Sequence, residues 1–195
     1  MADRPKASDN TRRRIVDSTL AMLQERDLAD INVGEIAAVA GVSRQTFYYH
    51  FHGIFEVFMS VIEGEMRFTY PRITGRFFSS PYECVLDYCR AVGKHKDIFY
   101  KFVFSPYRDN LIEDFRTYLH GVCEGAVRYI MGDGCQDDIV DVFARFHADG
   151  YIPIVHEWVE SRMEIDLEER MSVLASGFHR LFSSTVFSRA SENRI

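Results

Sequence analysis

The stretch that decides the fold runs from Ala40 to Phe51 and reads Ala-Gly-Val-Ser-Arg-Gln-Thr-Phe-Tyr-Tyr-His-Phe. Gly41 suits the left-handed residue of a tight turn after a short apolar helix, and Ser43 suits the N-cap of a second helix. Phe47 precedes Phe51 by four residues, which places both side chains on the inner face of that second helix. This layout is typical of a helix-turn-helix, whose second helix enters the major groove of DNA.

The polar side chains of the second helix are candidates for contact with DNA. Arg44 can donate two parallel hydrogen bonds to a guanine edge, and Gln45 can read atoms N6 and N7 of adenine. Ser43 and Thr46 carry short hydroxyls suited to phosphate or base contact. The polar tips of three more residues can reach the DNA backbone and hold the register: Tyr48, Tyr49 and His50. For Arg44 the alternative is a solvated side chain, and for Tyr49 and His50 it is packing at the helix end.

Two features upstream of this stretch extend the candidate interface. Asn32 and Glu35 have the spacing of a capping box and predict a helix over residues 33–39; Asn32 is also a candidate DNA contact. Arg12, Arg13 and Arg14 stand in the first turn of a predicted helix that begins near Thr11. Cations are unfavourable at that end of a helix dipole, so we expect these arginines, Arg12 and Arg13 in particular, to meet an external anion such as phosphate. Solvated charge is the alternative.

The distribution of charge separates a small head from a larger body. The chain has 195 residues and a formal net charge of −6. Its first 50 residues hold seven basic and seven acidic side chains, so the acidic excess lies in the remainder. A balanced, locally basic head on an acidic body suits a protein that contacts DNA with one part only. We therefore predict a DNA-binding domain over residues 1–52 and a second domain over residues 53–195.

The body reads as helical throughout. Hydrophobic residues make up 47% of the chain, and its 12 glycines and five prolines are scattered. Apolar residues recur at intervals of three and four, and the predicted helices cover residues 54 to about 70, 82–94, 98–104, 107–131, about 139–158 and about 167–185. Pro153 lies inside one of them and predicts a kink. The fold class is all-α, with about nine helices that form a three-helix head and a larger helical body.

These residues resemble the TetR family of transcriptional regulators over roughly residues 11–58. The resemblance rests on the arginine-rich first helix, Ile31-Asn32-Val33, Ile36-Ala37, Ala40-Gly41-Val42-Ser43 and Thr46-Phe47-Tyr48-Tyr49-His50-Phe51. Residues 45–55 are also similar to a subgroup that includes the activator of dihydroxyacetone kinase genes. Family members often carry phosphate-binding lysines where this chain has His52 and Ile54. That departure predicts a weaker phosphate clamp, or one moved to the arginines of the first helix.

The resemblance implies a homodimer on a palindromic double-stranded operator, with a ligand cavity among the middle helices. Phenol groups within apolar walls suit a small-molecule pocket, and the candidate lining residues are Phe68, Tyr88, Phe99, Phe102, Tyr107, Phe115, Tyr118, His147 and Tyr151. Ordinary core packing is the alternative for the aromatic residues, and a satisfied or interfacial histidine is the alternative for His147. The last two long helices are expected to pair with those of a second copy through Phe146, Trp158, Leu174, Phe178 and Leu181. Packing within the protomer is the alternative for these.

The function that follows is a regulator, most often a repressor in this family, which a small-molecule effector releases from DNA. One alternative is a regulator, repressor or activator, that answers to a protein partner instead. Another is an all-α enzyme, but the sequence assembles no catalytic acid, base or metal site, and we predict no cofactor and no metal. Cys84, Cys89 and His95 can bind a soft metal or sense oxidants, although buried inert thiols are the simpler reading. Without a signal peptide or an apolar run of about 18 residues, we expect a cytoplasmic protein with no membrane segment.

Overall fold

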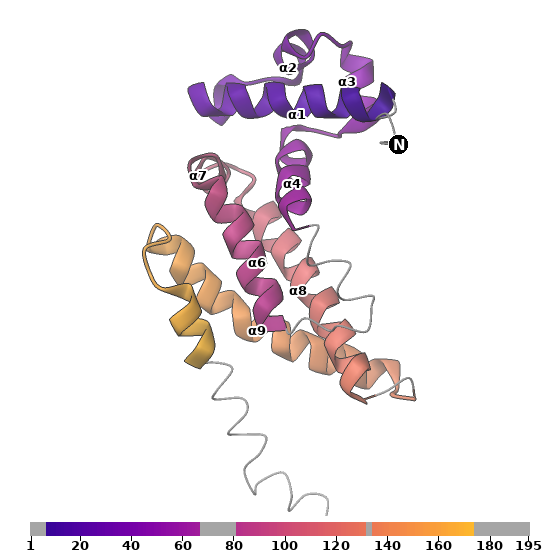
Figure 1. Cartoon of the computed structure of the whole chain (residues 1–195), viewed down its shortest axis with the longest axis vertical. Coiled ribbons are helices and arrows are strands. Elements are labelled where there is room, and N and C mark those ends of the chain that lie inside the picture. Colours follow the sequence, from indigo (N-terminus) through magenta and orange to yellow (C-terminus); the bar gives the residue numbers. More distant parts are fainter. Residues whose placement is uncertain (1–6, 67–80, 132–133, 174–195) are drawn as a thin grey trace, which may run out of the picture. The chain divides into compact units, whose positions relative to one another are not determined.

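The computed structural model describes residues 7–66, 81–131 and 134–173, and nearly all of these lie in helices (Figure 1). No strand occurs within these ranges, which confirms the all-α prediction. The chain divides into two compact units, one made of residues 1–71 and 90–115 and the other of residues 72–89 and 116–195. Within the described ranges, no helix has the length and apolar character that crossing a lipid bilayer requires.

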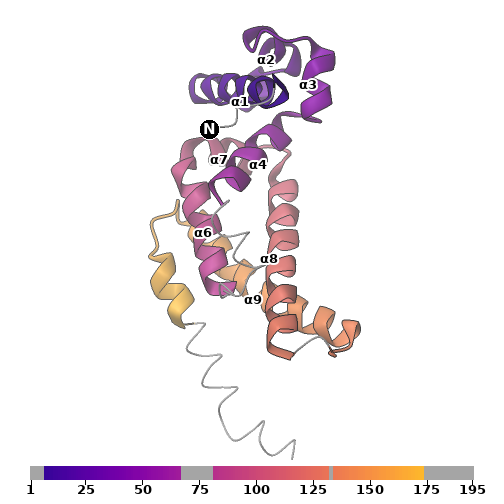
Figure 2. The ribbon, with the colours of Figure 1, turned by 45° about the vertical axis from the view of Figure 1, so that its right-hand side comes forward.

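The first unit begins with the predicted head. It contains α1 (Ala7–Glu25), a single 3-10 turn (Leu28–Asp30), α2 (Val33–Val39) and α3 (Arg44–His50). Helix α1 begins before the predicted Thr11. Helix α2 packs against both α1 and α3 (Figures 1 and 2).

Capping explains where the short helices of the head begin. The Asn32 side chain accepts a hydrogen bond from the backbone N–H of Glu35 at 3.1 Å, and the Glu35 carboxylate accepts one from the Asn32 N–H at 3.3 Å. This confirms the capping box. Ser43 Oγ accepts a hydrogen bond from the N–H of Thr46 at 3.0 Å and so caps α3. Between the helices Gly41 has φ +63°, the left-handed conformation that the turn requires.

The core of the head is built from one apolar face of each helix. Ile15 and Leu23 of α1, Ile36 of α2 and Phe47 of α3 are fully buried. Phe51, which follows α3, is also buried, and its ring centroid lies 6.1 Å from that of Phe47. The predicted inward orientation of the two phenylalanines is therefore confirmed.

Helices α4 (Ile54–Glu65) and α7 (Lys96–Val103) complete the packing of the first unit. Phe58 stacks on Phe102 with ring centroids 4.7 Å apart, and Phe55 meets Phe102 edge-on at 6.0 Å. Phe55 also stacks on Tyr107, with centroids 5.6 Å apart and planes 7° apart. Helix α4 makes contact with α1 as well, and so does α7. The predicted extension of α4 to about residue 70 lies outside the described residues.

The second unit is also helical. Its described part contains residues of α6 (Pro81–Lys94) and α8 (Arg108–Met131), all of α9 (Asp137–Glu160), and a helix that begins at residue 167 and is described to residue 173. Both α6 and α8 contribute residues to each unit. Helix α9 continues through Pro153, and the kink predicted there remains a prediction.

Candidate nucleic-acid interface

Helix α3 presents a polar, solvent-exposed face. Arg44 and Gln45 are exposed, as are Tyr48 and Tyr49, whose exposed fractions are 55% and 82%. Phe47 holds this face outward because it is the side chain that anchors α3 in the core. The two phenols therefore lie on the solvent side of α3, where sequence reasoning placed them.

The hydroxyls of Ser43 and Thr46 meet each other at the beginning of α3. Their oxygens lie 2.9 Å apart, and both residues take part in the N-cap. At the other end of α3, the rings of Tyr49 and His50 meet edge-on with centroids 5.1 Å apart. The structure thus brings the candidate DNA contacts of α3 together on one short helix.

Arg44 lies back against the first turn of α2. A Cβ placed on Gly34 would come within 2.7 Å of Arg44 Nε and 2.8 Å of its Cζ. Gly34 therefore makes the room that the Arg44 guanidinium occupies. Asn32, an exposed candidate contact, caps the same turn of α2, although its side-chain oxygen already accepts a hydrogen bond from Glu35.

Sequence reasoning missed this role of Gly34. The available signal was a glycine in the first turn of a well-capped helix, where alanine would stabilise the helix by about 0.5–1 kcal/mol.

The arginines of α1 have separate partners. The Arg12 guanidinium lies over the Phe51 ring, 4.8 Å from its centroid, in the geometry of a cation–π contact. Arg13 is exposed and its Nε lies 3.9 Å from the Asp17 carboxylate. A surface ion pair of this kind is weak, so Arg13 can exchange Asp17 for a phosphate group at little cost in free energy.

Arg14 acts inside the head. Its guanidinium donates hydrogen bonds to the carbonyls of Ala40 and Gly41, the second at 3.0 Å. Carbonyls at a helix C-terminus lack partners within the helix and carry partial negative charge. Arg14 therefore contacts neutral carbonyls of its own chain, where an external anion was expected, and it holds the turn that leads into α3.

His52 stands at one of the two positions where family members often carry phosphate-binding lysines, and it pairs with Glu56 of α4. His52 Nδ1 lies 2.8 Å from Glu56 Oε2, and the His52 N–H donates to the same oxygen at 2.5 Å. Partial burial raises the pKa of Glu56, but the hydrogen bonds from His52 outweigh that effect and hold the pKa below its usual value. A carboxylate that stays ionised here disfavours a nearby phosphate, in keeping with the predicted weak clamp.

The candidate ligand-binding residues divide between the two units. Phe99, Phe102, Tyr107 and Phe115 belong to the first, and Tyr88, Tyr118, His147 and Tyr151 belong to the second. In the first unit, Phe102 and Tyr107 pack with the phenylalanines of α4. In the second, His147 Nδ1 lies 2.8 Å from the Phe143 carbonyl at the surface. Phe68 lies outside the described residues.

The second unit holds a group of thiols and phenols on three helices, all buried except the half-buried Tyr118, which we call the thiol–phenol cluster: Cys84, Tyr88, Tyr118, Cys123 and Tyr151. The Tyr118 hydroxyl donates to the Cys84 carbonyl at 3.2 Å, and the rings of Tyr88 and Tyr118 lie 5.3 Å apart. Burial raises the pKa of the Cys84 thiol to about 11. Burial, with the neighbouring Cys123 and Cys84, raises the pKa of Tyr151 to about 12.

These groups are therefore neutral at physiological pH, and the buried thiols are poor nucleophiles. No group of three or more His, Cys, Asp or Glu side chains suited to a metal ion occurs among the residues that the structure describes. Sequence reasoning did not place the two cysteines in this cluster, because nothing in their separation of 39 positions indicates proximity.

Helix α9 has an apolar face whose side chains are exposed to solvent. It consists of Ile139, Val142, Phe143 and Phe146, and the exposed fractions of Val142 and Phe146 are 64% and 61%. Of the other residues predicted at the dimer interface, Trp158 is buried within the protomer. Leu174, Phe178 and Leu181 lie outside the described residues.

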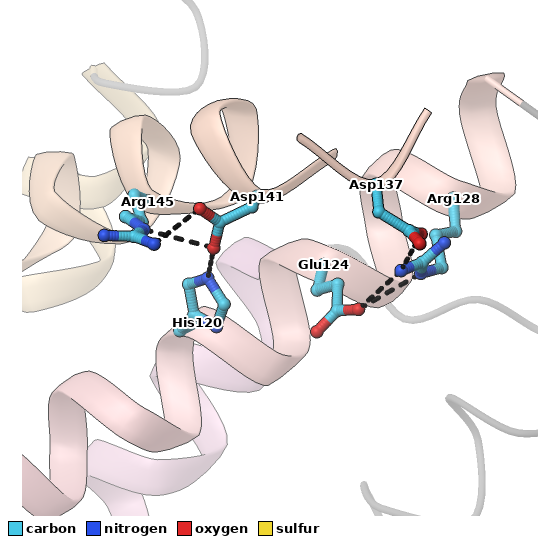
Figure 3. Close-up of polar contacts among 6 residues, drawn as sticks. All are labelled: His120, Glu124, Arg128, Asp137, Asp141 and Arg145. Atoms are coloured by element: carbon cyan, nitrogen blue, oxygen red, sulfur yellow. Dashed lines mark hydrogen bonds and ion pairs between the residues drawn. The ribbon is translucent and has the colours of Figure 1, made fainter. Parts of the chain in front are cut away.

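Two polar clusters attach the beginning of α9 to α8 (Figure 3). Asp141 lies between His120, at 3.2 Å, and Arg145, whose guanidinium donates at 3.1 and 2.5 Å. Hydrogen bonds from Arg145 and His120 hold the pKa of Asp141 below its usual value. In the second cluster, Arg128 donates to Glu124 at 3.0 Å and to Asp137 at 2.9 Å. Between the two helices, the pairs His120–Asp141 and Arg128–Asp137 are the contacts that join α8 to α9 in these clusters.

Comparison with known proteins places the chain in a family. Residues 15–58 match the family model described as bacterial regulatory proteins, tetR family. Residues 79–177, more than half of the chain, match the model described as transcriptional regulator C-terminal region. The first match covers α2 and α3, and the second covers most of the body.

Individual relatives agree with these matches. The chain is 36% identical over 55 residues to the HTH-type transcriptional regulator SrpR of Pseudomonas putida, a match over 28% of this chain and 26% of the relative. It is 38% identical over 52 residues to the uncharacterized HTH-type transcriptional regulator TtgW, also of Pseudomonas putida, over 27% of this chain and 39% of the relative. The chain thus spans well under half the length of both.

A solved structure shares the fold. The structure of the dihydroxyacetone kinase operon activator DhaS superposes with a TM-score of 0.58 at 18% sequence identity, over 85% of this chain and 92% of that one. The two family matches lead to one conclusion: the chain belongs to the TetR family of transcriptional regulators, and its head is a helix-turn-helix.

Proposed function

We propose that the protein is a homodimeric repressor that binds a palindromic operator and is released from it by a small-molecule effector. The observation that carries this proposal is the polar face of α3, which a buried phenylalanine core holds outward. In this proposal each protomer inserts α3 into the major groove of one half-site, and the two half-sites lie about 34–36 Å apart. The effector changes the separation or direction of the two α3 helices, so the dimer no longer fits both half-sites.

Within each half-site some side chains contact base edges and others contact the DNA backbone. Arg44 and Gln45 stand in the first turn of α3, the part of a recognition helix that contacts base edges. Tyr48, Tyr49 and His50 follow and contact the backbone, as do Arg12 and Arg13 of α1. Arg44 reads guanine from the position that Gly34 leaves open to it.

The Arg44→Ala variant tests this arrangement. We expect operator affinity to fall by roughly 1–3 kcal/mol and the preference at one base pair to relax, because a bidentate contact to guanine is lost. The measurement is a gel shift on a duplex selected from a random pool by the wild-type protein, followed by binding to the same duplex with single base changes. Unchanged affinity and unchanged base preference would remove Arg44 from the interface.

Gly34→Ala provides a matched second variant that leaves Arg44 in place. The new methyl group displaces the guanidinium, while alanine favours the helix by about 0.5–1 kcal/mol over glycine. We therefore expect a protein at least as stable as the wild type with an altered base preference at the Arg44 position. A stable Gly34→Ala variant with wild-type preference would show that the position of Arg44 does not set specificity.

The exposed face of α9 supports the proposed dimer, with a second copy of this chain as the occupant. Its four apolar residues recur at helical spacing and form one stripe. A palindromic operator requires a two-fold protein, and an apolar stripe at a two-fold axis packs against its own copy. We propose that α9 and the helix that begins at residue 167 form the interface.

Phe146→Glu tests the dimer. We expect the species of twice the 22.6 kDa chain mass to give way to one of 22.6 kDa at micromolar concentration, because two carboxylates would be buried at the axis. Light scattering after size-exclusion chromatography measures this. Ile112→Glu, which adds the same charge at another partly exposed apolar position, is the control and is expected to remain dimeric. A dimeric Phe146→Glu protein would move the interface elsewhere.

The thiol–phenol cluster supports an effector site in the second unit. It offers phenol hydroxyls among apolar and thiol groups, the mixture with which small-molecule sites fix an apolar ligand. We propose that the effector is a compound with an apolar body and a hydrogen-bonding group that Tyr118 or Tyr151 contacts. A screen for compounds that weaken operator binding by the wild type but fail to weaken it for Tyr118→Phe or for Tyr151→Phe tests this site. A compound that acts equally on all three proteins would place the site elsewhere.

A further inference from the structure

Two adjacent residues of α7 contact different helices of the first unit. Phe102 is buried against the phenylalanines of α4. Lys101 extends to the C-terminal end of α1, where its Nζ donates a hydrogen bond to the Arg26 carbonyl at 2.6 Å. Only 23% of the Lys101 side chain is exposed. Figures 1 and 2 show α7 next to this end of α1.

The acceptor of this hydrogen bond is the carbonyl of the residue that follows α1. The Arg26 N–H still donates a hydrogen bond to the Met22 carbonyl at 2.9 Å. The carbonyls at the end of a helix, however, receive no hydrogen bond from an N–H group of the same helix. Lys101 supplies the missing donor, with its charge next to the negative end of the helix dipole. The Asp27 carboxylate lies 3.9 Å from Nζ and is highly exposed, so the carbonyl is the main partner.

Arg26 in turn contacts the beginning of α2. Its guanidinium donates to the Asp30 carbonyl and, at 3.3 Å, to Glu35 Oε2. The same carboxylate oxygen accepts the Asn32 N–H in the capping box. A continuous series of polar contacts therefore leads from Lys101 through Arg26 to the first turn of α2.

The two ends of α2 are thus held by Arg14 of α1 and by Arg26, the residue that follows α1. Arg14 holds the carbonyls at its C-terminal end, and Arg26 holds the capping box at its N-terminal end. Helix α3 follows α2 through a turn at Gly41, so the direction of α2 determines where α3 points. Lys101 is the contact that fixes Arg26 from outside the head.

We propose that Lys101 is a positioning residue for DNA recognition: from α7 it fixes the junction between α1 and α2 and thereby the orientation of α3. Lys101 acts through Arg26 and Glu35 and does not contact DNA. The inference rests on the proposed role of α3 in reading DNA.

Lys101→Met tests the proposal, because methionine keeps an unbranched apolar side chain and removes the donor. The probe is a duplex selected from a random pool by the wild-type protein. We expect Kd to rise about tenfold, the change that corresponds to one hydrogen bond from a charged donor. The slope of log Kd against log salt should stay at its wild-type value, because no phosphate contact is lost.

Two variants serve as controls. Lys101→Arg retains a charged donor and is expected to restore most of the affinity. Lys96→Met makes the same change of charge on the same helix, at a lysine that forms no ion pair within the described residues, and should bind like the wild type. Hydrogen exchange provides a readout without DNA: the backbone amides of residues 32–36 should exchange faster in Lys101→Met than in Lys96→Met.

Several results would overturn the proposal. Wild-type affinity for DNA in a folded Lys101→Met protein would overturn it. An equal loss of affinity in Lys96→Met would also overturn it, because that result would indicate a general effect of charge. A shallower salt slope would identify Lys101 as a direct phosphate contact.

Should Lys101→Met fail to fold, Glu35→Gln tests the same series of contacts from its other end. It keeps an acceptor for the Asn32 N–H and weakens the pairing with Arg26, so we expect weaker binding at an unchanged salt slope; unchanged binding would count against the series. If no duplex is selected at all, the proposed function fails, whereas the exchange of residues 32–36 still reports whether Lys101 holds the junction.

Discussion

Phe102→Ala is expected to lower the free energy of unfolding by about 3–5 kcal/mol, the largest effect of any single substitution considered for this protein. Phe102 is fully buried and its ring contacts Phe55, Phe58 and Tyr107. Its removal leaves a cavity between α4 and α7 that the surrounding rings cannot fill without leaving their rotamers. Urea denaturation followed by circular dichroism measures the change.

Phe104→Ala is the matched control for this substitution. Phe104 ends the same helix, but 69% of it is exposed, and its ring stacks on Tyr100 with centroids 5.9 Å apart. We expect a loss below about 1 kcal/mol. Similar losses for the two alanine variants would mean that the aromatic packing between α4 and α7 does not determine stability.

Gly41→Val is expected to destabilise the protein by about 2–3 kcal/mol and to weaken operator binding with it. A residue with a Cβ pays about 1–2 kcal/mol for the left-handed conformation that Gly41 adopts at φ +63°. The new Cβ would also stand 2.6 Å from Arg14 Nη2, which displaces the partly exposed hydrogen bonds of Arg14 at a cost of about 1 kcal/mol. Thermal unfolding and a gel shift measure the two effects.

Two further variants, one at Gly64 and one at Gly41, separate backbone strain from the contact with Arg14 as causes of the loss. Gly64→Ala, in α4 with open space around it, should stabilise the protein by about 0.5–1 kcal/mol, because it only removes the flexibility of a helical glycine. Gly41→Asn should lose less than Gly41→Val, because asparagine tolerates the left-handed region. Equal losses for valine and asparagine would point to the contact with Arg14 as the cause and would exclude backbone strain.

Local sequence patterns predicted the head well. The caps at Asn32 and Ser43, the turn at Gly41 and the inward Phe47 each depend on residues within four positions of one another. Interactions of that range are determined by helix geometry, so the sequence alone is sufficient to infer them.

Contacts between residues distant in sequence were not predictable in the same way. Arg14 reaches residues 26 and 27 positions away, and Lys101 reaches Arg26 over 75 positions. Each acceptor is a backbone carbonyl, which every residue possesses and which therefore leaves no signal in the sequence. Similarly, the aromatic residues predicted to line one cavity belong to two units, because abundance of aromatic side chains does not specify which of them meet.

The backbone acceptors of Arg14, Arg26 and Lys101 have an evolutionary consequence. A scaffold that is anchored on main-chain carbonyls does not depend on which side chains occupy the outward positions of α3. Arg44, Gln45 and Tyr48 can therefore be exchanged during divergence without loss of the framework that carries them. Such a head can acquire specificity for a new operator through substitutions at a few surface positions, while the lysine and the two arginines that support it stay the same.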